Sequence, residues 1–218
     1  MTYTRAIGVG CAYLVDKIVR AFALARIHPN FLTFLGLAIN IVAAWQFARG
    51  RFVAAGIVVI LAGIFDLTDG PVARSTNRVT RFGGFFDSVV DRYSDLALYF
   101  GLLVYYASIN RFFYIVLTAV VMTGSVMVSY SRARAENTIP SCKVGFLERP
   151  ERIVLIILGA LTDRMAPVLW VIAVLSNLTV VHRMIYTWHQ ATALERAQLE
   201  PLADAPVEPV REDAAPAR

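Results

Sequence analysis

Five aspartates stand at helical spacing in two neighbouring apolar segments of this sequence. Asp66 and Asp69 are three residues apart at the end of one apolar run, and Asp87, Asp91 and Asp95 follow at intervals of four residues at the start of the next. Residues three or four apart share one face of a helix, so each group presents its carboxylates on one side. The two helices are consecutive and joined by a short loop, so we expect antiparallel neighbours whose acidic faces meet at one depth.

Carboxylates gathered in a low-dielectric site repel one another unless a cation lies among them. Oxygen-only ligands suit Mg²⁺, Mn²⁺ or Ca²⁺ rather than zinc, and one or two such ions would neutralise a diphosphate and activate a hydroxyl. Gly70 and Gly83 let a ligand approach the backbone, Ala73 keeps the next turn small, and Arg74 can bind a phosphate with two hydrogen bonds. The alternative is that the aspartates only cap helices or pair with Arg74 and Arg92. Five at helical spacing exceed what capping explains.

The composition indicates a polytopic membrane protein. Of the 218 residues, 57% are hydrophobic and 17% are charged, with a mean hydropathy of +0.58. Soluble domains average about 45–50% apolar and about 25% charged residues. We expect an all-α membrane protein of six transmembrane helices, with spans at 31–48, 52–65 (continuing through the first two aspartates), 83–106, 112–130, 153–161 (beginning among the charges before it) and 167–185.

The two ends of the chain differ from this core. Within 1–27, apolar residues recur on one helical side and Asp16, Lys17 and Arg20 lie on the other, which predicts an amphipathic helix in the membrane interface. A disordered cytoplasmic tail is expected over 191–218, where Pro, Ala, Glu and Asp dominate. The expected membrane domain is therefore 1–190, with a six-helix core at 28–190.

The distribution of basic residues predicts the orientation of the bundle. Cytoplasmic segments of membrane proteins carry an excess of Lys and Arg. One side of the expected bundle receives Arg5, Lys17, Arg20, Arg26, Arg74, Arg78, Arg81, Arg132, Arg134, Lys143, Arg149 and Arg152, and the other receives Arg49, Arg51, Arg111 and Arg164. Both termini and the aspartates are therefore expected on the cytoplasmic side of the cell (inner) membrane. The net charge of +5 lies beside apolar blocks, which favours anionic lipids over nucleic acid.

The aspartates belong to a longer pattern. The residues Asp66-Leu-Thr-Asp69-Gly70-Pro-Val-Ala73-Arg74, followed after eight residues by Gly83 and then by Asp87 and Asp91, match D-x2-D-G-x2-A-R-x8-G-x3-D-x3-D at every position. This resembles the signature of the CDP-alcohol phosphotransferase family. The resemblance covers 28–186 and includes a family-like entry, Pro29-Asn30-x2-Thr33, to the first span.

The resemblance implies a homodimeric six-helix enzyme whose site opens to the cytoplasmic leaflet. It implies that Asp66, Asp69 and Asp87 hold Mg²⁺ or Mn²⁺, and that Asp91 is a general base that also touches metal. It further implies that Gly70, Ala73, Arg74 and Gly83 lie along the CDP moiety of a CDP-lipid such as CDP-diacylglycerol. The acceptor hydroxyl would attack the β-phosphorus and release CMP.

A second cationic segment bears on the acceptor alcohol. Arg132 and Arg134 close the fourth expected span and Arg149 and Arg152 open the fifth, so four arginines are candidate ligands of a phosphate on the acceptor. The alternative is ordinary positive-inside charge. The segments Asp87-Ser88, Asp91-Arg92 and 148–152 look like the phosphatidylinositol-phosphate synthase branch. Phosphatidylglycerophosphate synthesis from glycerol 3-phosphate is the alternative reaction, and His182 and Arg183 are interpreted as flanking residues.

Two other classes of protein could carry such an aspartate cluster, a cation transporter and a catalytically inactive scaffold. A cation transporter that used the aspartates as its ion site would place them near the middle of the membrane, with an exit path for the ion. Here they lie at one end, beside Arg74, which suits a phosphate. A catalytically inactive scaffold would have lost at least one position of the motif, and none is lost.

Overall fold

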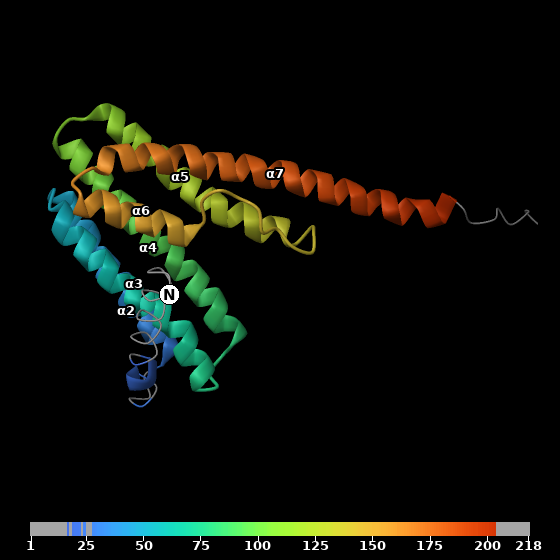
Figure 1. Cartoon of the computed structure of the whole chain (residues 1–218), viewed down its shortest axis with the longest axis horizontal. Helices are drawn as coiled ribbons and strands as arrows, with labels where there is room; N and C mark the ends of the chain where they lie inside the picture. Colours follow the sequence, from blue (N-terminus) through green and yellow to red (C-terminus); the bar gives the residue numbers. More distant parts are fainter. Residues whose placement is uncertain (1–16, 18, 23, 25–27, 204–218) are drawn as a thin grey trace, which may run out of the picture.

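The computed structural model describes residues 28–203 and, before them, 17, 19–22 and 24. All regular structure in this part of the chain is helical, and its six long helices fall on the six segments expected from hydropathy (Figure 1). They are α2 (Pro29–Ala48), α3 (Phe52–Ser75), α4 (Arg81–Ser108), α5 (Phe112–Ala135), α6 (Arg149–Leu161) and α7 (Met165–Ala203). The interfacial helix expected over 1–27 lies almost wholly outside the described residues.

Four of these helices, α2, α3, α5 and α7, are long and apolar enough to cross a membrane. Helix α4 has 28 residues but carries charges throughout its first half, and α6 has only 13 residues. At about 1.5 Å per residue, α6 is roughly 20 Å long, against about 30 Å of hydrocarbon. The chain is therefore a multi-pass helical membrane protein with at least these four candidate spans.

The outward surfaces confirm an apolar environment. On α2, Thr33 and Asn40 face inward and are buried, whereas Phe34 and Trp45 are more than half exposed. This is the reverse of a soluble helix, where the polar side meets the solvent. Comparable apolar side chains are exposed along the other helices described.

The helices form one bundle in which α2 packs closely on two neighbours and α5 on α7. Helix α2 lies against α3 and α4, while α5 packs on α4 and α7, and α6 fills the space between α3 and α7. In Figure 1, α5 and α7 run side by side, and α7 extends well beyond the rest of the bundle. At the crossing of α2 and α4, Gly101 faces the backbone carbonyl of Ala44 so closely that a β-carbon has no room.

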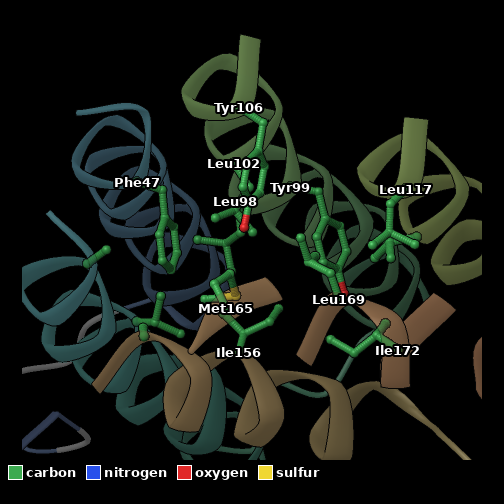
Figure 2. Close-up of a cluster of buried hydrophobic side chains, with 14 of the residues drawn as sticks. Phe47, Leu98, Tyr99, Leu102, Tyr106, Leu117, Ile156, Met165, Leu169 and Ile172 are labelled. Atoms are coloured by element: carbon green, nitrogen blue, oxygen red, sulfur yellow. The ribbon is translucent and has the colours of Figure 1, made fainter. Parts of the chain in front are cut away.

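The main apolar core of the described residues joins all six of these helices, away from the aspartates of the motif. Figure 2 shows part of it: Phe47 of α2 lies on one side of the α4 side chains and Leu117 of α5 on the other, with side chains of α6 and α7 below. The members labelled there are Phe47, Leu98, Tyr99, Leu102, Tyr106, Leu117, Ile156, Met165, Leu169 and Ile172. Helix α4 thus serves two purposes, since its second half holds the bundle together and its first half carries the carboxylates.

Local signals fix where the functional helices begin. The Thr80 hydroxyl accepts a hydrogen bond from Gly83 N at 2.9 Å, which caps α4 about two turns before Asp87. Helix α6 begins at Arg149 with a capping box, in which Glu148 and Glu151 satisfy each other's backbone amides. The expectation that this helix starts among the charges is confirmed.

The expected start of the disordered tail, at residue 191, is wrong. Helix α7 continues to Ala203, so 191–203 are helical. The physical reason is composition, because Ala, Leu, Glu, Arg and Gln in 191–200 are all strong helix formers. The rest of the expected tail, 204–218, lies outside the described residues.

Candidate active site

The carboxylate of Asp69 is held rigidly at the wall between α2 and α3. Its Oδ2 accepts a hydrogen bond from the Thr33 hydroxyl at 2.8 Å, and its Oδ1 accepts one from Gly70 N at 2.6 Å. Asp69 is buried at 7% exposure, and these two donors fix its orientation. Such outer contacts are typical of carboxylates that act as ligands.

The carboxylates of α3 and α4 do face each other, and a guanidinium lies between them. Arg149 donates from one terminal nitrogen to Asp66 at 2.7 Å, and its other terminal nitrogen forms an ion pair with Asp91 at 2.9 Å. Its Nε donates to Asp95 at 3.2 Å. One planar group therefore joins three carboxylates from two helices, and this is the convergence that the helical spacing predicts.

These residues fit a divalent cation. The donors are all carboxylate oxygens, which Mg²⁺ and Mn²⁺ prefer, and Arg149 stands in for the positive charge that Asp66 and Asp91 need. In the described part of the chain no three acidic, histidine or cysteine side chains are yet close enough to hold one ion. A closed cage of aspartates therefore requires Arg149 to give up these two carboxylates.

A cavity of about 220 Å³ opens beside Asp69 and Asp87. Its walls include every residue expected along a CDP-lipid, which places Gly70, Ala73, Arg74 and Gly83 together around one space. Thr33 and Asn30 complete it from α2. Small residues on adjoining helix turns leave the room, and Arg74 supplies the cation.

A second cavity, of about 440 Å³, is lined by Asp91 and Asp95 of α4. It is bounded by α4, α5 and the start of α6, and by Arg183 of α7. Asp91 and Arg149 line it together with Arg132, so it combines a motif carboxylate with several cations.

Arg183 is more than a flanking residue, which corrects its interpretation from the sequence. It is 1% exposed and donates to the Val144 carbonyl at 2.8 Å, to the Val128 carbonyl and to Glu148 at 3.0 Å. Arg132 meets the same Glu148 oxygen at 3.1 Å. Glu148 thus holds two guanidinium groups at the wall of the larger cavity.

Two of the four arginines expected to bind the acceptor do not line this cavity. Arg134 is exposed and lies on neither cavity wall, because residues two apart on a helix point about 200° apart and Arg132 already faces inward. Arg152 is 1% exposed beneath the cavity and pairs with Asp95 at 2.7 Å. Arg132 and Arg149 are where the sequence predicts them.

The sequence gives little warning of Gly36, which contacts the site from α2. A β-carbon at this position would lie 2.7 Å from Asp66 Oδ1. Its only signal is a glycine one turn after Thr33 on the same helical face. The sequence shows Glu148 as one of several acidic residues near the start of α6, and nothing in its spacing indicates the two arginines that it contacts.

The comparisons with known proteins agree on one family. Residues 26–190 match the model of the family described as CDP-alcohol phosphatidyltransferase. The archaetidylinositol phosphate synthase of Pyrococcus horikoshii is 35% identical over 171 residues, which cover 78% of this chain and 88% of that protein. The phosphatidylinositol phosphate synthase of Mycobacterium tuberculosis is 32% identical over 196 residues, covering 85% and 90%.

Solved structures show the same fold. The M. tuberculosis phosphatidylinositol phosphate synthase with CDP-DAG bound superposes with a TM-score of 0.74 at 30% identity, covering 81% of this chain and 94% of that one. The crystal structure of the same enzyme in complex with manganese and citrate gives a TM-score of 0.73 at 31% identity, covering 80% and 88%.

Proposed function

Because this chain belongs to the CDP-alcohol phosphatidyltransferase family, we propose that it joins CDP-diacylglycerol to inositol phosphate and releases CMP. One observation carries the proposal. A small-residue cavity with Arg74 is lined by Asp69 and Asp87, and a larger cavity with Arg132, Arg149 and Arg183 is lined by Asp91, one turn after Asp87 on α4. Two substrates that both carry phosphate therefore have separate cavities, and each cavity is bordered by aspartates of the same motif.

The smaller cavity suits the CDP-lipid. Gly70, Ala73 and Gly83 leave the backbone accessible to the nucleotide, and Arg74 has the geometry to bind a phosphate with two parallel hydrogen bonds. The M. tuberculosis relative with CDP-DAG bound supports this assignment, since its fold covers most of this chain.

The larger cavity suits a phosphorylated alcohol. Arg132, Arg149 and Arg183 exceed what an uncharged acceptor needs, and guanidinium groups match phosphate geometry. The relatives that make inositol-phosphate lipids favour inositol phosphate over glycerol 3-phosphate. Membership of a transferase family also removes the alternative of a cation transporter.

Asp91 is the proposed general base. It lines the acceptor cavity and faces Asp66 across Arg149, so an acceptor hydroxyl seated there would lose its proton to the Asp91 carboxylate. The acceptor oxygen then bonds to the β-phosphorus, the bond to the CMP oxygen breaks, and CMP leaves. Asp66, Asp69 and Asp87, with Asp91, are the residues that would hold Mg²⁺ or Mn²⁺, which supplies charge neutralisation at the diphosphate. Thr33 keeps Asp69 in place throughout.

The surroundings of the site complete the proposal. We infer six spans, with α4 and α6 crossing as part of the bundle, an interfacial N-terminal helix, and a homodimer. Helix α4 is charged in its first half and α6 is short, but both pack against helices that are long and apolar enough to span. The excess of basic residues on the aspartate side supports a site that faces the cytoplasm from the cell membrane.

The experiment is a turnover assay with purified protein, Mg²⁺ and CDP-diacylglycerol, offered inositol phosphate, glycerol 3-phosphate, free inositol and serine in turn. We expect CMP release to be fastest with inositol phosphate and to be lost in Asp91→Asn. No CMP with any acceptor contradicts the transferase proposal. Fastest turnover with glycerol 3-phosphate contradicts only the choice of acceptor.

A further inference from the structure

We propose that Asp95 is a positioning residue that holds Arg149 at the boundary between the metal-binding carboxylates and the acceptor cavity. The proposal deepens the proposed function and rests on it. Asp95 lies one turn beyond Asp91 on α4 and outside the eight-position motif, so none of the roles given above falls to it.

The Nε of Arg149 and its two terminal nitrogens contact different carboxylates. Asp95 Oδ1 accepts from Nε at 3.2 Å, near the root of the guanidinium. The two terminal nitrogens bond instead to Asp66 and Asp91. A guanidinium fixed at Nε keeps both terminal nitrogens within reach of whatever lies in front of them.

This division matters because Arg149 also lines the acceptor cavity. When Asp66 and Asp91 engage another cation, the terminal nitrogens lose their partners and become available to an anion in that cavity. The bond to Asp95 then keeps the side chain in place, so its phosphate-binding geometry is formed in advance. Without the anchor, a long flexible side chain must be ordered each time an acceptor binds.

Asp95 is in turn fixed from below. Its Oδ2 accepts from Arg152 at 2.7 Å, and both residues are at least 95% buried. Two further nitrogens of Arg152, Nε and Nη1, are buried without a hydrogen-bond partner among the described residues. Arg152 is thus committed to Asp95, and removing Asp95 alone would strand a buried charge.

The test therefore compares two variants. Arg152→Met removes the lower partner but keeps the bond from Asp95 to Arg149. The double variant, Asp95→Leu with Arg152→Met, replaces the whole buried pair by apolar side chains of similar size, a change that is often neutral for folding. Only the double variant loses the anchor of Arg149. Thermal unfolding in detergent checks that the two variants melt alike.

We expect the KM for inositol phosphate to rise about tenfold in the double variant and to stay within about twofold of wild type in Arg152→Met, since an unanchored arginine must be ordered on binding. The KM for CDP-diacylglycerol stays unchanged in both. An equal acceptor KM in the two variants overturns the proposal, because a merely structural pair affects them alike.

A binding measurement separates this proposal from the proposed function. If the wild type releases no CMP with any acceptor, the function fails, and calorimetric titration with inorganic phosphate in the presence of Mg²⁺ decides the role of Asp95. Weaker phosphate binding in the double variant than in Arg152→Met supports the positioning role, and equal binding in both refutes it.

Discussion

Gly36→Ala should damage catalysis while leaving the fold nearly as stable as before. The new β-carbon would lie 2.7 Å from Asp66 Oδ1, and ordinary contact begins near 3.4 Å, so the carboxylate must move by about 0.7 Å. Asp66 cannot yield freely, because Arg149 holds its other oxygen at 2.7 Å. The clash therefore falls on the carboxylate proposed to bind metal.

The expected sizes of the two effects differ widely. Forcing Asp66 off its rotamer costs about 0.5–1.5 kcal/mol, and replacing a helical glycine by alanine gains about 1 kcal/mol, so the stability terms nearly cancel. A displacement of about 1 Å at a catalytic centre lowers rate by about 10²-fold. We expect kcat for CMP release to fall by about 10–100-fold in Gly36→Ala.

A matched control lies on the helix that carries Asp66. Gly63 of α3 has no atom within 4 Å of its hypothetical β-carbon, so Gly63→Ala should keep full activity and unfold at the same or a slightly higher temperature. Full activity of Gly36→Ala beside an unchanged Gly63→Ala would show that Asp66 has room to move, and the reasoning would be refuted.

Three further predictions concern the cavity, the metal and the helix packing. Arg132→Ala should raise the KM for inositol phosphate several-fold whereas Arg134→Ala should not, and equal effects would restore a purely topological role to both. Chelation of divalent cations should abolish CMP release, and Mg²⁺ or Mn²⁺ should restore it; turnover that survives EDTA contradicts the metal assignment. Gly101→Ala should leave little folded protein in detergent, because its β-carbon meets the Ala44 carbonyl, whereas Gly84→Ala has open space and should purify normally; equal yields on size-exclusion chromatography argue against that crossing.

The sequence predicts the acidic centre well because its signals are local. Helical spacing places Asp66 with Asp69 and Asp87 with Asp91, and a short loop between consecutive helices makes the two faces meet. Hydropathy locates all six helices of the described part, although it does not give the start of α6 or the end of α7. Each of these inferences uses residues that are close together along the chain.

Partners that are distant in the chain were beyond such reasoning. Arg149 reaches Asp66 across 83 positions, and Thr33 reaches Asp69 across 36. Spacing on α6 also misleads, because Arg149 and Arg152 share a helix face but lie almost a turn apart in depth. One therefore reaches the cavity and the other stays buried beneath it, and only the packed bundle distinguishes them.

The shortness of α6 has a consequence for where its charged first residue lies. The helix runs roughly 20 Å, about 10 Å less than the hydrocarbon thickness, so its two ends cannot both reach the bilayer surfaces. One end leads into the charged turn Asp163-Arg164, and at the other end Arg149 meets the carboxylates of α3 and α4. A guanidinium that begins so short a helix is thus matched by protein carboxylates, where a longer helix would present it to water.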